Sequence, residues 1–207
     1  MHDFEFAAGS VVGHDHLRAA KNGHDAWHIE STDAALVAVV CDGCGSASDS
    51  EIGAKLAAPI VARALAACGS DWSAATGEIA SKLGAMIAVT GRPEAFLFTI
   101  LAAVINDDRT TIVARGDGSF VLNDEVTTLG PFPGNAPPYF RYEPRLDVLR
   151  TLPTLQVERL VLGTDGAPAH EPWTGDRYFA NPDAIRRALF RLQPNDDATI
   201  VAIRRRR

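Results

Sequence analysis

The sequence is poor in cysteine, in long apolar runs and in secretory features. It contains three cysteines, Cys41, Cys44 and Cys68, in 207 residues. An odd number of thiols in a chain long enough to bury a core predicts reduced cysteines rather than a disulfide framework. The longest apolar run, 95–105, is far shorter than the roughly 20 residues that span a bilayer. Since the N-terminus also lacks an apolar leader, we expect a cytoplasmic protein that does not enter the membrane.

An excess of basic residues is absent as well. The chain has 20 Lys and Arg against 26 Asp and Glu, and four of the basic residues form the terminal run 204–207. This balance argues against a general nucleic-acid-binding protein, which needs a positive field. The terminal arginines are expected to form a frayed, solvated end.

The composition is otherwise that of a globular protein, with 46% apolar and 22% charged residues. No internal repeat, low-complexity segment or linker divides the sequence. Residues 1–207 are therefore expected to form one domain, which we take to be a monomer.

The first half of the sequence predicts a buried strand and two helices. Residues 34–41 are continuously apolar and are followed by an acidic residue and a glycine, as is typical of a strand buried on both faces. Apolar residues recur at helical spacing over 50–68, with the N-cap among the residues 48–50, and again over 71–89. Pro59 is expected to kink or split the first of these helices.

The second half of the sequence is typical of an antiparallel sheet. Short apolar segments alternate with turns rich in Asn, Asp and Gly, and a proline-rich loop, 130–138, divides them. Asn181 followed by Pro182 signals the start of a helix. Because the long helices come as a block and hairpins dominate, we expect an α+β fold rather than a doubly wound parallel sheet. The expected strands are 95–105, 110–114, 119–122, 125–129, 157–163 and 198–203.

Carboxylates stand at the ends of three of the expected strands. Asp42 and Asp165 each follow an apolar strand and precede a glycine, whereas Asp196 and Asp197 come just before the last strand. Aspartates gathered at one sheet edge need a cation to stay ionised together, and hard oxygen ligands select Mg²⁺ or Mn²⁺. The glycines would let the backbone approach a ligand closely. The alternative for each Asp-Gly pair is ordinary turn chemistry.

Five segments, in order along the chain, resemble the motifs of one enzyme family. They are 11–29 (VVGHDHLRAAKNGHDAWHI), 37–58 (VAVVCDGCGSASDSEIGAKLAA), 114–120 (ARGDGSF), 160–167 (LVLGTDGA) and 195–203 (NDDATIVAI). Together they resemble the metal-dependent Ser/Thr protein phosphatases of type 2C, in their compact bacterial single-domain branch. The resemblance implies a four-layer α-β-β-α sandwich of two antiparallel sheets flanked by helices. It also implies two divalent metal ions, Mn²⁺ or Mg²⁺, at one end of that sandwich.

The resemblance assigns metal-binding roles to three of the strand-end aspartates. Asp42 would bridge both metals, and the carbonyl of Gly43 would bind one of them. Asp165 and Asp196 would complete the second metal. Asp196 is taken rather than Asp197 because the family's closing motif uses the first of the two residues as the ligand.

Two further aspartates match metal positions less closely. Asp117 corresponds to the position that holds a weaker third metal in some relatives, but the usual Gly-Asp-Ser-Arg motif is Gly-Asp-Gly-Ser here. Asp25 corresponds to the acidic residue of the family's opening motif, which contributes to the metals directly or through water.

The residues that bind phosphate and donate a proton are left open by the sequence. Many relatives hold the substrate phosphate with a basic residue near the opening motif, and Arg18 and Lys21 are both candidates. Cys44 stands where relatives often have His or Met, so protonation of the leaving group would fall to His16 or His24. The loop 130–138 would form a lip on the substrate side.

The leading hypothesis is a phosphoserine/phosphothreonine protein phosphatase. A water bridging two metals would attack the phosphomonoester, and the enzyme would act in signal transduction against a partner Ser/Thr kinase. The alternative is a catalytically weak pseudophosphatase that binds a phosphoprotein or a kinase. Two other hypotheses fit less well. An aspartyl phosphotransferase needs a second Asp where Cys44 stands, and the Cys-x-x-Cys of Cys41 and Cys44 lacks the helix start that lowers a thiol pKa in redox proteins.

Overall fold

The computed structural model describes residues 3–168 and 173–206. Its strands are β1 (Phe4–Val11), β2 (Ala26–Ser31), β3 (Leu36–Cys41), β4 (Ile100–Ile105), β5 (Arg109–Arg115), β6 (Gly118–Leu122), β7 (Glu125–Leu129), β8 (Asp147–Pro153), β9 (Arg159–Gly163) and β10 (Ala198–Arg205). Its helices are α1 (His14–Arg18), α2 (Ser50–Cys68), α3 (Trp72–Thr90), α4 (Asp176–Ala180) and α5 (Ala184–Leu192), with short 3₁₀ turns η1 (Pro93–Phe96), η2 (Pro133–Asn135) and η3 (Thr154–Gln156).

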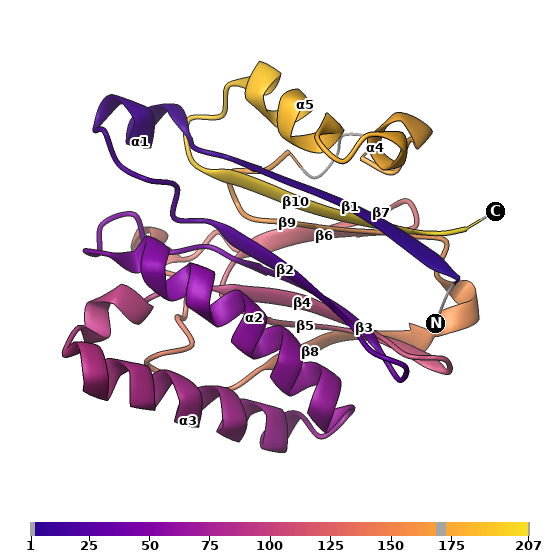
Figure 1. Ribbon diagram of the computed structural model, residues 1–207, viewed down its shortest axis with the longest axis horizontal. Coiled ribbons are helices and arrows are strands. Elements are labelled where there is room, and N and C mark those ends of the chain that lie inside the picture. The colour runs from indigo at the N-terminus through magenta and orange to yellow at the C-terminus, as the bar shows by residue number, and fades with distance from the viewer. Residues whose placement is uncertain (1–2, 169–172, 207) are drawn as a thin grey trace.

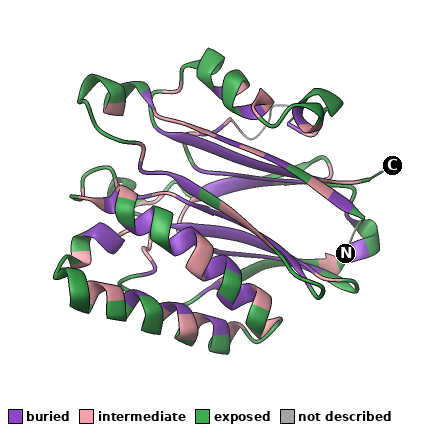
Figure 2. Ribbon diagram, viewed as in Figure 1, coloured by how far each residue is buried: buried purple, intermediate pink, exposed green. Residues whose placement is uncertain are grey.

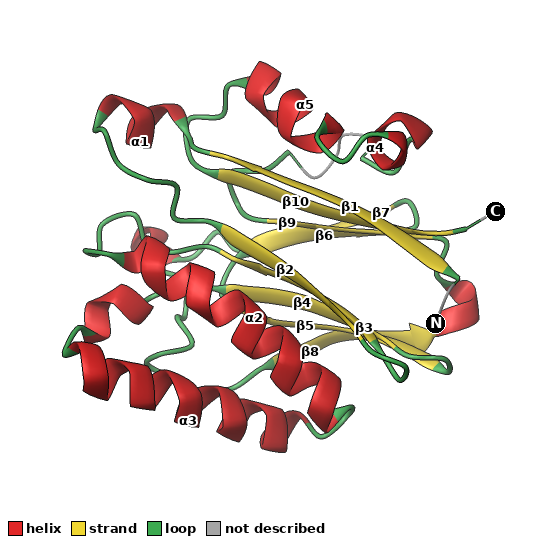
Figure 3. Ribbon diagram, in the orientation of Figure 1, coloured by secondary structure: helices red, strands yellow, loops and turns green. Residues whose placement is uncertain are grey.

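The strands form two antiparallel sheets of five strands each, which pack face to face (Figure 1). The first sheet has the order β1-β10-β9-β6-β7 and the second the order β2-β3-β4-β5-β8. Helices α4 and α5 cover the outer face of the first sheet, and α2 and α3 cover the outer face of the second (Figure 3). The expected α+β fold and its four-layer α-β-β-α sandwich are confirmed.

Apolar side chains form three clusters between the four layers, and the buried residues lie on the faces of the sheets and helices that meet one another (Figure 2). The central strand β3 shows how the sequence supports this, because it is buried at every position. Its alternate residues Val37 and Val39 face α2 and α3, whereas Ala38 and Val40 face the other sheet. The continuous apolar run that predicted a strand buried on both faces is therefore explained by two cores, one on each side.

Helix α2 runs unbroken through Pro59, so the expected split is wrong. Its buried face consists mostly of small residues, including Ala54 and Ala58 beside Val61, and packs against β2 and β3. We infer that this burial outweighs the penalty of an internal proline, about 3 kcal/mol.

Some element boundaries differ from those expected. The expected strand 95–105 begins only at Ile100, because the residues before it form the 3₁₀ turn η1. The helix expected to start at Asn181 starts at Ala184, since the Asn181 side chain accepts a hydrogen bond from the Asp183 amide and forms a turn first. Strand β8 lies outside the expected strands, because it is mostly exposed and lacks an apolar alternation.

The C-terminal arginines belong to the fold and do not form a frayed end. Strand β10 pairs with β1 as far as Arg205. The Arg204 guanidinium donates to Glu5 over 2.7 Å and lies over the ring of Phe179. The expectation of a solvated tail is therefore wrong for Arg204 and Arg205, because β1 offers both a pairing edge and an acidic partner. Arg207 lies outside the described residues.

The longest helices of the described chain, α2 and α3, have 19 residues each. Across residues 3–168 and 173–206, no helix combines the length and the apolarity that crossing a membrane requires.

The close packing of α2 depends on Gly53. A Cβ there would lie 1.8 Å from the carbonyl oxygen of Ala95, whereas a Cβ at Gly77 on α3 would meet open space. We expect Gly53→Ala to lower the free energy of unfolding by about 2 kcal/mol or more. Gly77→Ala should raise it by about 0.5–1 kcal/mol. Urea unfolding followed by circular dichroism measures both, and a Gly53→Ala protein as stable as the parent would contradict this packing.

Candidate active site

Four aspartates converge on one small cavity at the end of the sandwich. Asp42 directly follows β3, Asp117 lies in the turn between β5 and β6, Asp165 follows β9, and Asp196 precedes β10. All four line a cavity of about 60 Å³ together with Gly43. Because both sheets contribute strand ends, the site forms only when the two sheets pack together.

The carboxylates crowd one another in this cavity. Burial raises the pKa of Asp42 well above its ordinary value, and the neighbouring charges of Asp25 and Asp165 raise it further. Burial and the charge of Asp165 also raise the pKa of Asp117 to about 6. Among the described residues that line the cavity, none is Lys or Arg. The arrangement therefore collects negative charge without a cationic side chain to balance it.

The glycines after Asp42 and Asp165 serve close backbone packing. A Cβ at Gly43 would lie 2.8 Å from the carbonyl oxygen of Ser50, and a Cβ at Gly166 would lie 2.1 Å from that of Asp197. The sequence predicted that these glycines admit a ligand. Gly43 does line the cavity. On the side where a Cβ would stand, backbone of neighbouring segments packs against Gly43 and Gly166, and this packing fixes the positions of the two carboxylates.

Asp25 lies behind the cavity and does not line it. Its Oδ2 accepts a hydrogen bond of 2.7 Å from the Thr164 hydroxyl, while its buried Oδ1 has no partner. Burial, together with the charges of Asp197 and Asp165, raises the pKa of Asp25 to about 7. Thr164 was not singled out from the sequence, although it directly precedes Asp165.

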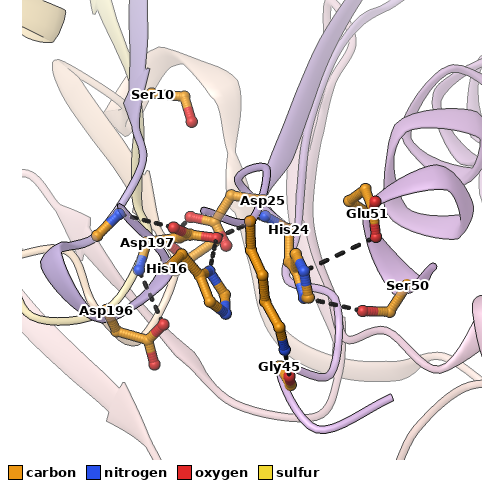
Figure 4. Close-up of polar contacts among 12 residues, drawn as sticks. Ser10, His16, His24, Asp25, Gly45, Ser50, Glu51, Asp196 and Asp197 are labelled. Atoms are coloured by element: carbon orange, nitrogen blue, oxygen red, sulfur yellow. Dashed lines mark hydrogen bonds and ion pairs between the residues drawn. The ribbon is translucent and has the colours of Figure 1, made fainter. Parts of the chain in front are cut away.

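Asp197 has a different task from its neighbour Asp196. It is buried, and its carboxylate accepts hydrogen bonds from the amides of Gly13 and His24 and contacts Nδ1 of His16 at 2.9 Å (Figure 4). It thereby fastens the segment around α1 to the start of β10. The sequence did not reveal this role, because its partners lie more than 170 residues away in the chain.

The rings of His16 and His24 lie against each other, tilted by 33°, with their centroids 4.2 Å apart. His24 is buried, and its Nδ1 lies 3.0 Å from the Ser50 hydroxyl, which itself donates to the Cys44 carbonyl. Because that hydroxyl proton is used, His24 Nδ1 is the donor of the pair. In His16 the contact to Asp197 occupies Nδ1, and Nε2 faces Gly45 at the cavity. His16 is therefore the histidine with a ring nitrogen directed toward the site.

Lys21 and Arg18, the two candidates for binding phosphate, differ in their distance from the cavity. Lys21 Nζ donates to the carbonyl oxygen of Gly45, a cavity residue, over 3.3 Å. Arg18 ends α1 and is exposed, and its guanidinium makes no hydrogen bond or ion pair within the described part of the chain. Of the two, Lys21 is the one that the fold brings to the site.

The proline-rich loop borders the cavity. Asn135 and Pro137 of the loop line the cavity, as does Tyr139 just after it. Burial raises the pKa of the Tyr139 hydroxyl, and its hydrogen bond with Cys44 raises it further. Cys44 thus lines the cavity and contacts the loop.

The chain matches one known protein family and several solved structures. The family model described as Protein phosphatase 2C matches residues 12–200. The structure of the serine/threonine phosphatase Stp1 from Staphylococcus aureus superposes with a TM-score of 0.72 at 13% identity, covering 99% of this chain and 96% of that one. No curated protein matches the sequence.

Two other solved structures are similar. The catalytic domain of the phosphatase PstP, in complex with 2 manganese ions, gives a TM-score of 0.63 at 16% identity, with 97% of each chain covered. RsbX in complex with magnesium gives 0.60 at 16% identity, covering 98% of this chain and 96% of that one. At such identities the likeness shows the fold.

The crowded carboxylates predict how the stability of the protein depends on pH when a chelator keeps it free of metal. Because the pKa values of Asp25, Asp42 and Asp117 are raised by folding, the folded state binds more protons than the unfolded state. Their contribution to the free energy of unfolding should therefore fall as the pH rises from about 4 to about 7. Asp42→Asn should make this decline shallower. Urea unfolding in chelator across that range measures it, and an equal or steeper decline in the variant would contradict the assignment.

Proposed function

Since the chain belongs to the protein phosphatase 2C family, we propose that the cavity of Asp42, Asp117, Asp165 and Asp196 is its catalytic metal centre. The protein is a metal-dependent phosphoserine/phosphothreonine protein phosphatase, and its substrate is a phosphorylated protein. The observation that supports the location is the gathering of four carboxylates in a cavity without a Lys or Arg among its described lining residues. Residues 1–207 would form a single catalytic domain.

The donor set fits divalent cations. Carboxylate oxygens and the Gly43 carbonyl are hard ligands of the kind that Mn²⁺ and Mg²⁺ prefer. Asp42, Gly43, Asp165 and Asp196 would hold two such ions, with Asp117 available to a weaker third. Asp25, with its unpartnered buried Oδ1, would act through water from behind. Bound cations would supply Lewis acidity, activating water and neutralising charge on the phosphoryl group.

The chain's own residues would position the substrate and handle protons. Lys21, beside Gly45, would hold the phosphate. The Asp197 carboxylate engages Nδ1 of His16, so the imidazolium form of His16 would carry its second proton on Nε2 and could give that proton to the departing Ser or Thr oxygen. His24 is better suited to support, because Ser50 already engages its Nδ1.

The alternative of a pseudophosphatase is not favoured, because the family's core aspartates are all present at the cavity. We further propose that the enzyme acts in cytoplasmic signal transduction as a monomer and opposes a partner Ser/Thr kinase. These finer points rest on the sequence resemblance.

Loss of a central carboxylate tests the metal centre. We expect hydrolysis of an aryl phosphate and of a phosphothreonine peptide to require Mn²⁺ or Mg²⁺ and to cease in chelator. Asp42→Asn and Asp165→Asn should lower kcat about 100-fold or more while circular dichroism stays unchanged. Asp33→Asn, an exposed aspartate in the turn between β2 and β3, is the matched control and should retain full activity. Retained activity in both cavity variants would remove the proposed centre.

Lys21 and Arg18 form a matched pair for the phosphate contact. Lys21→Ala should raise KM for the phosphothreonine peptide about 10-fold, the loss expected for one charge-assisted hydrogen bond. Arg18→Ala should leave KM near the parent value, since Arg18 does not contact the site. Steady-state kinetics at fixed Mn²⁺ distinguishes the two, and the reverse order would show that Arg18 moves in to bind the phosphate.

A further inference from the structure

A second hollow lies beside α3. It is an apolar groove of about 250 Å³ between the C-terminal half of α3 and the segment 140–144. Buried Leu83, Phe96 and Phe140 form its floor, and Gly84 and Ile87 lie along its helical side. Nothing in the proposed catalytic chemistry uses this groove.

Two residues that line the groove lie close in sequence to residues that line the metal cavity. Phe140 directly follows Tyr139, and Phe96 lies on the same short segment as Thr99, just before β4. Tyr139 and Thr99 line the cavity, whereas Phe140 and Phe96 line the groove. A peptide with its phosphate in the cavity would therefore lie beside segments whose neighbouring residues form the groove.

The segment 140–147, which borders the groove, is anchored to the core. Phe140 is almost completely buried. Farther along, the buried guanidinium of Arg115, at the end of β5, pairs with Glu143 and Asp147. Arg145 joins the same two carboxylates at 3.1 and 3.0 Å. The groove is thus preformed, and binding in it does not require the segment to fold.

The positive charge of Arg141 at the edge of the groove indicates which residue of a bound peptide would lie next to an apolar side chain in the groove. Arg141 is exposed at the groove and makes no hydrogen bond or ion pair within the described residues. Its free guanidinium would suit an acidic residue, while the floor suits a leucine or phenylalanine side chain. The metal cavity, at about 60 Å³, is small and lined mainly by polar residues, so it offers little apolar surface to a flanking side chain.

We propose that this groove is a docking site for the phosphoprotein substrate. It binds one apolar side chain near the phosphorylated residue, and Arg141 faces an acidic neighbour of that side chain. The inference rests on the proposed function, because it places the substrate phosphate in the adjoining cavity.

Two glycines of α3 provide the test. A Cβ at Gly84 or at Gly77 would meet open space, but only Gly84 lines the groove. Gly84→Leu should therefore fill the groove without disturbing the fold, and Gly77→Leu is the matched control. The substrates are an aryl phosphate and a set of phosphothreonine peptides in which one Phe is moved through the flanking positions of an alanine-based sequence.

In the parent enzyme, Phe at one or more flanking positions should raise kcat/KM about 10-fold over the all-alanine peptide, as burial of one large apolar side chain allows. Gly84→Leu should abolish this gain and Gly77→Leu should keep it. Both variants should hydrolyse the aryl phosphate at the parent rate. A second peptide set with Glu beside the preferred Phe should show a further gain that Arg141→Ala removes.

The possible failures are distinguishable. If the parent hydrolyses the aryl phosphate but no Phe position helps, or if the gain survives Gly84→Leu, this inference alone is overturned. If the parent hydrolyses nothing with Mn²⁺, the proposed function is wrong and the docking site falls with it. Dimerisation in analytical ultracentrifugation that Gly84→Leu abolishes would identify a second copy of the chain as the occupant instead.

Discussion

Mutual repulsion among carboxylates is the constraint on which the rest of this structure depends. Asp42, Asp117, Asp165 and Asp196 point into one cavity from four strand ends. Ionised together they oppose folding unless a cation joins them. Such a set persists only on a frame that cannot relax by moving apart, and the interleaved core between two five-stranded sheets supplies that frame.

A layer of hydrogen bonds behind the carboxylates turns that frame into a site of defined geometry. Thr164 connects two strand ends, since its hydroxyl donates to Asp25 and accepts from the amide of Thr199. Asp197 receives donors from the α1 segment and holds it against the start of β10. The same contacts bring His16 and Lys21 to the rim. The residues that set the geometry are therefore neighbours in sequence of the candidate ligands, but they have separate tasks.

This division explains what the sequence revealed and what it did not. The α+β class was predictable because the long helices come as a block and hairpin-type strands follow them, whereas the four-layer sandwich was implied by the resemblance to the type 2C phosphatases. The ends of the apolar runs β3, β9 and β10 are where Asp42, Asp165 and Asp196 were expected. The separate role of Asp197 was not predictable, since two adjacent aspartates look alike until partners far along the chain fold onto one of them. Strand β8 escaped prediction because it is held by pairing with β5 and not by an apolar face of its own.

Chemistry and recognition occupy different parts of the fold. The candidate ligands stand at strand ends packed against the core, where a substitution that alters the packing would move a carboxylate. The surfaces that meet a protein substrate lie instead on the lip between β7 and β8 and on the end of α3, outside the two sheets. Substitutions there, at Tyr139, Arg141 or Gly84, alter what reaches the cavity without moving a carboxylate. A small, polar cavity can therefore serve a selective enzyme, because the selection is made on the surface beside it.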